Sequence, residues 1–64
     1  MPGAIINTNT SIGEACIINC GAIIDHNCVI EKGCHIGIGT IIKGFNKIEQ
    51  LTVIKAGAIL ERGN

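Results

Sequence analysis

Aliphatic side chains return at every sixth position along almost the entire chain. A step of six residues meets an isoleucine or leucine ten times without interruption, at Ile6, Ile12, Ile18, Ile24, Ile30, Ile36, Ile42, Ile48, Ile54 and Leu60. An amphipathic helix would place its apolar residues three and four positions apart, and a flat strand would alternate with a period of two. The period of six therefore predicts a repetitive β-structure in which every hexapeptide contributes one short strand.

The positions around these aliphatic residues repeat with the same period. Two positions earlier the side chain is small in nearly every hexapeptide: Thr10, Cys16, Ala22, Cys28, Cys34, Thr40, Thr52 and Ala58. Three positions later glycine recurs, at Gly21, Gly33, Gly39, Gly57 and Gly63. Glycine readily adopts the positive φ angle that a tight corner requires. We therefore expect a strand and a corner in each hexapeptide, with the aliphatic and small side chains pointing inward.

This pattern resembles the hexapeptide-repeat acyltransferase superfamily, and the resemblance runs from about residue 4 to residue 64. It implies an all-β fold, a left-handed parallel β-helix in which three hexapeptides form each triangular coil. About three coils would then make a single domain of residues 1–64. The left hand is implied by the family alone, because parallel crossover connections are otherwise right-handed.

The residue before each inward aliphatic side chain should point outward, because side chains alternate along a strand. On one face of the expected prism these residues are all isoleucine: Ile5, Ile23, Ile41 and Ile59. The other faces carry Ser11, Val29 and Lys47, and Ile17, His35 and Val53. A monomer rarely leaves a continuous apolar face in water, and the family assembles as three-fold trimers along such faces. We expect a homotrimer; the alternative is that a domain outside this sequence covers the isoleucines.

Composition narrows the possible partners and the cellular location. Basic and acidic residues number five each, so the chain lacks the basic surface typical of nucleic-acid binders. No stretch approaches the roughly 18 apolar residues of a membrane span, and the first residues do not resemble a secretory signal. These features predict a cytoplasmic protein, in which cysteines are usually thiols.

Cys16 and Cys34 would stack one coil apart. We expect them to fill the inside of a corner as small residues rather than to form a disulfide or metal pair.

The segment from Ile18 to Cys28 contains the candidate catalytic motif. It reads INCGAIIDHNC, and a second histidine, His35, follows nine residues after His26. This arrangement resembles the subgroup that acetylates sialic acids and nucleotide-linked amino sugars. The resemblance implies direct transfer of an acetyl group from acetyl-CoA to a sugar hydroxyl or amine, without a metal. It makes His26 and Asn19 the catalytic residues and includes Asn27 in the binding site.

Position in the repeat supports a role for His26. It follows an inward aliphatic residue by two positions, so we expect it at a corner beside the isoleucine face. The residue one coil later is Gly44, which would leave room for a ligand and whose N–H could stabilise a developing oxyanion. An imidazole can remove a proton from a hydroxyl or amine near neutral pH, and His35 could hold the acceptor or acetyl group. The alternative for His26 is a solvated corner residue.

Three features depart from the subgroup pattern. An acidic residue often follows the histidine there, whereas this chain has Asn27, and strand alternation predicts that the preceding Asp25 points away. Phe45 occupies a corner position where glycine is common, either as a bulged corner over the cofactor or as an apolar residue at a subunit seam. The N-terminal α/β domain and the coenzyme-A-clasping tail of the subgroup are not in this sequence, so we expect a fragment or the product of a remnant gene.

Two other functions remain open from the sequence. A catalytically inactive trimeric β-helix module is the main alternative to an acetyltransferase, because the parts that usually surround the coils are missing. A metal enzyme of the γ-carbonic-anhydrase type shares the fold, but it needs three histidines at a subunit interface and this chain has two. Saturable binding of coenzyme A would separate the acetyltransferase from the inactive module.

Overall fold

The computed structural model describes residues 3–63 and shows ten strands of two residues each. The strands are β1 (Ile5–Ile6), β2 (Ser11–Ile12), β3 (Ile17–Ile18), β4 (Ile23–Ile24), β5 (Val29–Ile30), β6 (His35–Ile36), β7 (Ile41–Ile42), β8 (Lys47–Ile48), β9 (Val53–Ile54) and β10 (Ile59–Leu60). Every strand ends on one of the aliphatic residues that repeat with a period of six. The described residues form no helix, so the expected all-β class is confirmed.

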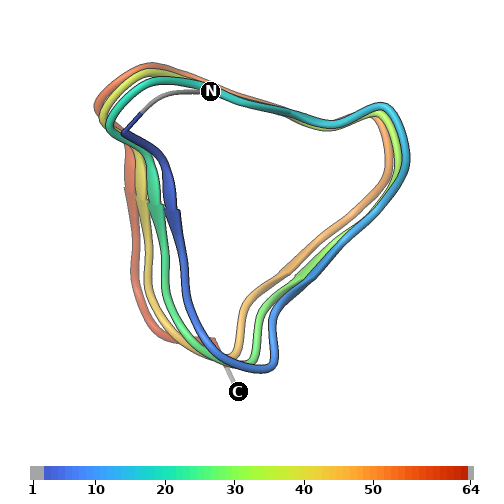
Figure 1. The fold of residues 1–64 in the computed structure, drawn as a ribbon, viewed down its shortest axis with the longest axis vertical. Helices are drawn as coiled ribbons and strands as arrows, with labels where there is room; N and C mark the ends of the chain where they lie inside the picture. Colours follow the sequence, from blue (N-terminus) through green and yellow to red (C-terminus); the bar gives the residue numbers. More distant parts are fainter. Residues whose placement is uncertain (1–2, 64) are drawn as a thin grey trace.

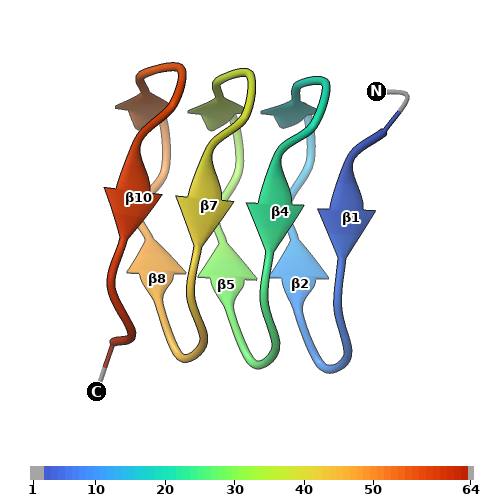
Figure 2. The ribbon, with the colours of Figure 1, turned by 90° about the vertical axis from the view of Figure 1, so that its left-hand side faces the viewer.

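The strands form three parallel sheets, one on each side of a triangular coil (Figure 1). Sheet A contains β1, β4, β7 and β10, sheet B contains β2, β5 and β8, and sheet C contains β3, β6 and β9. Figure 2 shows the four strands of sheet A side by side, pointing in the same direction. With β1 nearest the viewer in Figure 1, the chain runs counterclockwise as it recedes, so the solenoid of about three turns is left-handed.

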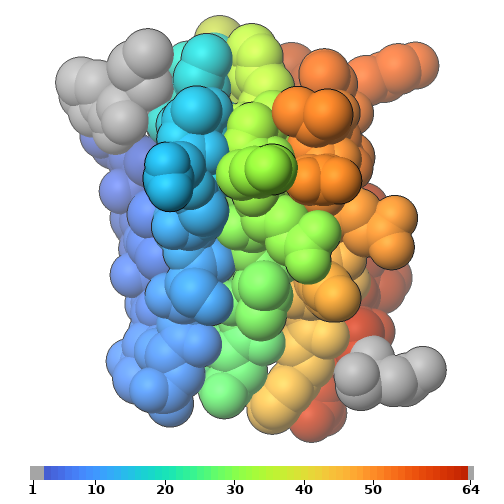
Figure 3. All heavy atoms as spheres, turned by 90° about the vertical axis from the view of Figure 1, so that its right-hand side faces the viewer, coloured from blue at the N-terminus to red at the C-terminus, as the bar shows by residue number. Residues whose placement is uncertain are grey.

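Paired strands align the inward residues in continuous columns. In sheet A, Ile6 pairs with Ile24, Ile24 with Ile42, and Ile42 with Leu60. Ile24 and Ile42 are completely buried, whereas Ile6 is 46% exposed because another coil covers it on only one side. Burying an isoleucine side chain contributes about 1.5–3 kcal/mol, so the central columns supply much of the stability. Figure 3, viewed from the side opposite sheet A, shows successive coils as closely packed bands.

Residues with positive φ recur at the corners with a period of six from Gly3 to Gly57, whereas Gly63, expected at the next corner, does not have a positive φ. Half are glycines, at positions 3, 21, 33, 39 and 57, and half are Asn9, Ala15, Asn27, Phe45 and Leu51. The left-handed conformation costs a residue with a Cβ roughly 1–2 kcal/mol, a cost that asparagine reduces by local hydrogen bonding. Phe45, with φ of 61°, has the same corner conformation as its equivalents. No bulge therefore interrupts the coil at Phe45.

The small inward residues bind the backbone of the next coil. Cys16 Sγ donates to the Glu31 carbonyl oxygen at 3.1 Å, and Cys34 Sγ donates to the Glu49 carbonyl oxygen at 3.0 Å. Thr40 Oγ1 makes the equivalent bond, to the carbonyl of Lys55 at 3.0 Å. The four cysteines are free thiols, and Cys34 is buried. The expectation that these cysteines fill corners as small residues is confirmed, and thiol and hydroxyl serve the same structural purpose.

The outward side of sheet A is lined by isoleucine, as expected. Ile5, Ile23, Ile41 and Ile59 are paired in register. The outer two are more than half exposed, and the central two are partly buried by their neighbours. A single chain thus leaves an apolar strip open to solvent. Across residues 3–63 the structure has no helix that could cross a membrane.

Candidate functional site

The candidate chemistry gathers at the corner that joins sheet A to sheet B, here called corner AB. It consists of residues 7–10, 25–28, 43–46 and 61–63, which lie between the strands of these two sheets. His26 follows β4 by two residues and lies at this corner, with its side chain 49% exposed. The corner position expected for His26 is therefore confirmed.

Asp25 contacts His26 twice through one carboxylate oxygen. Asp25 Oδ1 accepts the backbone N–H of His26 at 2.8 Å and lies 3.0 Å from His26 Nδ1. The expectation that Asp25 points away from His26 is wrong, because β4 ends at Ile24 and strand alternation does not continue into the corner. An aspartate at a turn commonly binds nearby backbone in this way. Asn7, one coil earlier, adds a third donor to Oδ1 at 3.3 Å.

These contacts favour the ionised form of the Asp25 carboxyl. The pKa of the Asp25 carboxyl lies below its ordinary value of 3.8, chiefly because the His26 side chain hydrogen-bonds to it, and the His26 backbone N–H and Asn7 also lower it. Asp25 is therefore ionised at neutral pH and can only accept hydrogen bonds. In a neutral imidazole the nitrogen that faces a carboxylate carries the hydrogen. Hydrogen on Nδ1 would satisfy this contact and leave the lone pair on Nε2.

Gly44 forms the surface against which the imidazole of His26 rests. A Cβ placed on Gly44 would lie 2.9 Å from His26 Cε1 and 3.1 Å from Nε2, closer than ordinary contact. Gly44 thus lies beside His26 as expected, but the imidazole occupies the space that a Cβ would fill, and room for a ligand there stays a prediction. The N–H of Phe45, the next residue, donates to the His26 carbonyl oxygen at 3.2 Å.

An aromatic and cationic stack continues from His26 along corner AB. The Phe45 ring meets the imidazole edge to face, with ring centroids 5.2 Å apart, and the Arg62 guanidinium lies 4.8 Å from the Phe45 centroid. Beside this stack, Lys43 Nζ pairs with Glu61 Oε1 at 3.1 Å. Such exposed pairs contribute little to stability, about 0–1 kcal/mol. The charged group in hydrogen-bonding contact with the imidazole is Asp25, at 3.0 Å from Nδ1.

The remaining expected site residues are divided among different parts of the coil. Asn27 directly follows His26 and has a φ of 57°. Asn19 lies at the corner between sheets C and A, where its Oδ1 accepts the backbone N–H of Cys20 at 2.8 Å. His35 lies in β6 of sheet C, half-buried and paired in register with Ile17 and Val53. One chain thus brings His26, Asn27 and Gly44 together, but neither Asn19 nor His35 joins them.

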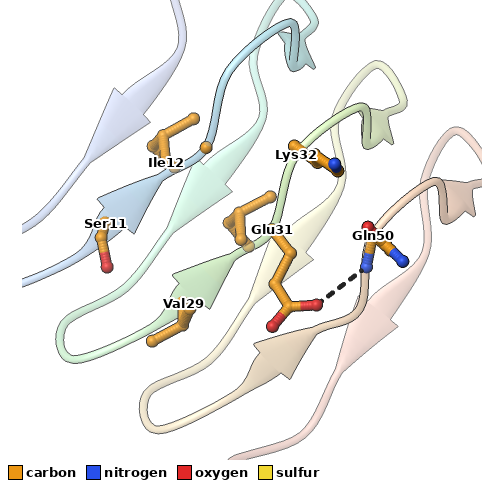
Figure 4. A pocket seen from close by; sticks show the side chains of 8 residues that line it. Ser11, Ile12, Val29, Glu31, Lys32 and Gln50 are labelled. Carbon is orange, nitrogen blue, oxygen red and sulfur yellow. Dashed lines mark hydrogen bonds between the residues drawn. The ribbon is translucent and has the colours of Figure 1, made fainter.

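An open groove of about 530 Å³ lies elsewhere, along sheet B and the following corner (Figure 4). Its lining residues are Ser11, Ile12, Gly13, Val29, Ile30, Glu31, Lys32 and Gln50. Glu31 extends across it, accepting the backbone N–H of Gln50 at 3.1 Å, and pairs with Lys47 at 3.5 Å. The repeat pattern does not predict this groove, and His26 does not line it. Nowhere in residues 3–63 do three potential metal-ligating side chains cluster as a metal site.

Comparison of the chain with protein-family models, curated proteins and solved structures finds no match. The observed architecture is a parallel β-solenoid of about three coils, which is consistent with a hexapeptide-repeat β-helix. A fold supports many functions, so an activity has to be inferred from the site. In this chain the site with the most distinctive chemistry is the Asp25–His26 pair at corner AB.

Proposed function

We propose that this chain is an acetyltransferase that moves an acetyl group from acetyl-CoA to a hydroxyl or amine of a sugar, either a sialic acid or an amino sugar. The observation that carries the proposal is the contact of His26 Nδ1 with the Asp25 carboxylate at 3.0 Å. This contact leaves Nε2 as a proton acceptor at an accessible corner. A general base placed in this way contributes about 10²–10⁴-fold to a reaction rate.

His26 performs both proton transfers in the proposed reaction. Nε2 removes the proton from the sugar hydroxyl or amine as its oxygen or nitrogen attacks the thioester carbonyl carbon. A tetrahedral oxyanion forms, and its collapse breaks the carbon–sulfur bond. His26 then returns the proton to the departing thiolate of coenzyme A, so the enzyme ends in its starting state. The Gly44 N–H is the proposed donor to the oxyanion, a type of interaction that is often a large part of catalysis.

We further propose that the active assembly is a homotrimer in the cytoplasm. The isoleucine face of sheet A supports this proposal, since burying each outward isoleucine would contribute about 1.5–3 kcal/mol. Corner AB borders sheet A, so a neighbouring copy on that face would stand beside His26. Asn19 and His35 are distant from His26 in the coil, and in this proposal the neighbouring copy supplies them. Asn27 and Gly44 contribute from the same chain.

Measuring acetylated sugar by mass spectrometry tests the proposed activity without interference from the four thiols. We expect wild-type chain, acetyl-CoA and an amino-sugar or sialic acid acceptor to yield the acetylated product. His26→Ala should lower kcat by about a hundredfold or more, as expected for removal of a general base. Glu31→Gln is the control. Glu31 lies at the corner between sheets B and C, away from corner AB, so this variant should retain the wild-type rate. Equal rates for His26→Ala and the wild type would remove His26 from the reaction.

An inactive trimeric β-helix module is the second candidate function, and one observation favours it. The groove along sheet B does not include His26, and the imidazole is half exposed rather than enclosed. Titration calorimetry with coenzyme A separates the two functions. Saturable binding supports the acetyltransferase, whereas no heat of binding at millimolar ligand supports the module.

A further inference from the structure

A single oxygen of Asp25 holds both the backbone and the ring of His26. Oδ1 accepts the His26 N–H at 2.8 Å, lies 3.0 Å from Nδ1, and also accepts from Asn7 Nδ2 at 3.3 Å. The bond to the backbone N–H fixes the carboxylate relative to the corner, and the bond to Nδ1 fixes the ring relative to the carboxylate. Turning the ring away would break the second bond.

We propose that Asp25 is a positioning residue that keeps hydrogen on Nδ1 of His26 and leaves Nε2 free to accept a proton. The catalytic part of this inference depends on the proposed acetyl transfer. In the subgroup that the chain resembles, the acidic residue often comes after the histidine, and here that position is Asn27. The carboxylate is instead supplied by the residue before His26, whose direction within the corner the sequence pattern did not predict.

Among the groups around His26, Asp25 is the one that can set the tautomer of the imidazole. Asn7 and Thr8, on the preceding coil, are neutral. On the following coils Lys43 is paired with Glu61 at 3.1 Å, and Arg62 lies over Phe45 rather than over the imidazole. Within residues 3–63, Asp25 is therefore the full charge in hydrogen-bonding contact with His26. Gly44 and Phe45 limit where the ring can lie but cannot choose its tautomer.

The carboxylate also affects the charged form of His26. When Nε2 takes a proton from the acceptor, the imidazole becomes a cation that stays in contact with ionised Asp25. A charge-assisted hydrogen bond is roughly twice as strong as a neutral one, so the contact strengthens as the proton moves. Removing Asp25 should consequently lower kcat more than it weakens the binding of either substrate.

Nitrogen NMR of the imidazole side chains provides a readout that does not depend on activity. The full chain is measured at a pH above the titration range of histidine, with His26→Gln to assign the signals and His35 as an internal reference. We expect His26 to carry hydrogen on Nδ1 in the wild type and to lose this preference in Asp25→Ala. Glu31→Ala removes the acid at the equivalent position of the next corner and should leave the His26 signals unchanged.

Kinetics of the same variants complete the test. Asp25→Ala should lower kcat by between about tenfold and a thousandfold, less than removal of the more buried acid of a serine-protease triad, with KM for acetyl-CoA changed less than twofold. Asp25→Asn loses the charge and can donate as well as accept, so it should weaken the preference for hydrogen on Nδ1 and also lower kcat. Circular dichroism and melting curves verify that the variants are folded.

Either of two NMR results would overturn the positioning role of Asp25: hydrogen on Nε2 of His26 in the wild type, or the same tautomer in Asp25→Ala as in the wild type. Wild-type kcat in Asp25→Ala would overturn it as well. A wild-type chain that acetylates no sugar would instead refute the proposed function, and the NMR result would still decide whether Asp25 sets the tautomer of His26.

Discussion

Replacing Gly44 by alanine should reduce activity while leaving stability nearly unchanged. The new Cβ would lie 2.9 Å from His26 Cε1, whereas ordinary contacts begin at 3.4 Å, so the imidazole has to move by about half an ångström. Because a displacement of about 1 Å at a catalytic group can cost a hundredfold in rate, half that distance predicts a loss of about tenfold in kcat. The half-exposed ring can move toward solvent, and the His26 carbonyl oxygen, 3.3 Å from the new Cβ, has to shift only slightly.

Stability should change little in Gly44→Ala because two effects oppose each other. Gly44 does not have a positive φ, and alanine at such a position stabilises a protein by about 0.4–1 kcal/mol through the unfolded chain. The displaced ring and a 3.3 Å approach of the new Cβ to the His26 carbonyl oxygen reduce this gain. We therefore expect a free energy of unfolding within about 1 kcal/mol of the wild type, a limit set by that gain.

Gly57→Ala is the matched control, because we expect it to lower stability and leave kcat unchanged, the reverse of Gly44→Ala. Gly57 has a φ of 75°, and a Cβ there would meet nothing within 4 Å. Alanine should lose about 1–2 kcal/mol of stability from the left-handed conformation and keep the wild-type kcat. Urea unfolding and product formation measured on both variants give the comparison. Wild-type kcat in Gly44→Ala, or a stability loss there as large as in Gly57→Ala, would refute the role assigned to Gly44.

Three further predictions concern the thiols, the Asp25 carboxylate and the isoleucine face. Cys34→Thr should keep the bond to the Glu49 carbonyl and unfold at nearly the wild-type urea concentration, whereas Cys34→Val should lose about 0.5–1.5 kcal/mol, because that carbonyl would keep only its bond from Thr52 Oγ1. Because the folded pKa of Asp25 is lowered, its stabilising effect should be complete above the ordinary pKa of 3.8 and lost as pH falls through the folded pKa. Melting temperatures of the wild type and Asp25→Asn should accordingly converge in acid; a gap that persists there would contradict the assignment. In sedimentation experiments Ile23→Lys, on sheet A, should be monomeric and Val29→Lys, on sheet B, trimeric; identical masses would contradict an interface on sheet A.

The strands and the interior could be predicted from the sequence because one physical constraint repeats. Each inward isoleucine needs a partner above and below it, and an 18-residue coil satisfies this need for Ile24, Ile30, Ile36 and Ile42 alike. The small residue two positions earlier follows from the limited space inside a corner. Periodicity therefore determines which side chains point inward, including those of the cysteines.

The corner chemistry could be predicted only in part. The corner position of His26 follows from its place two residues after Ile24 in the sequence. Its contact with Gly44 follows from the 18-residue length of a coil, which places Gly44 next to His26. The direction of Asp25 does not, because its side chain is oriented by hydrogen bonds within a turn after β4 has ended. Phe45 and Leu51 also show that a corner can impose positive φ on residues other than glycine or asparagine. The groove beside Glu31 depends on side-chain packing across three coils, which leaves no signal in the spacing.

Mapping acetyl-CoA onto the chain by NMR is the most direct test of the claim that corner AB is the functional site. Backbone amide shifts are followed as acetyl-CoA is added to the wild-type chain. We predict saturable shifts centred on His26, Gly44 and Phe45. Shifts centred instead on the groove of Ser11, Glu31 and Gln50, or no saturable shift at millimolar acetyl-CoA, would contradict it.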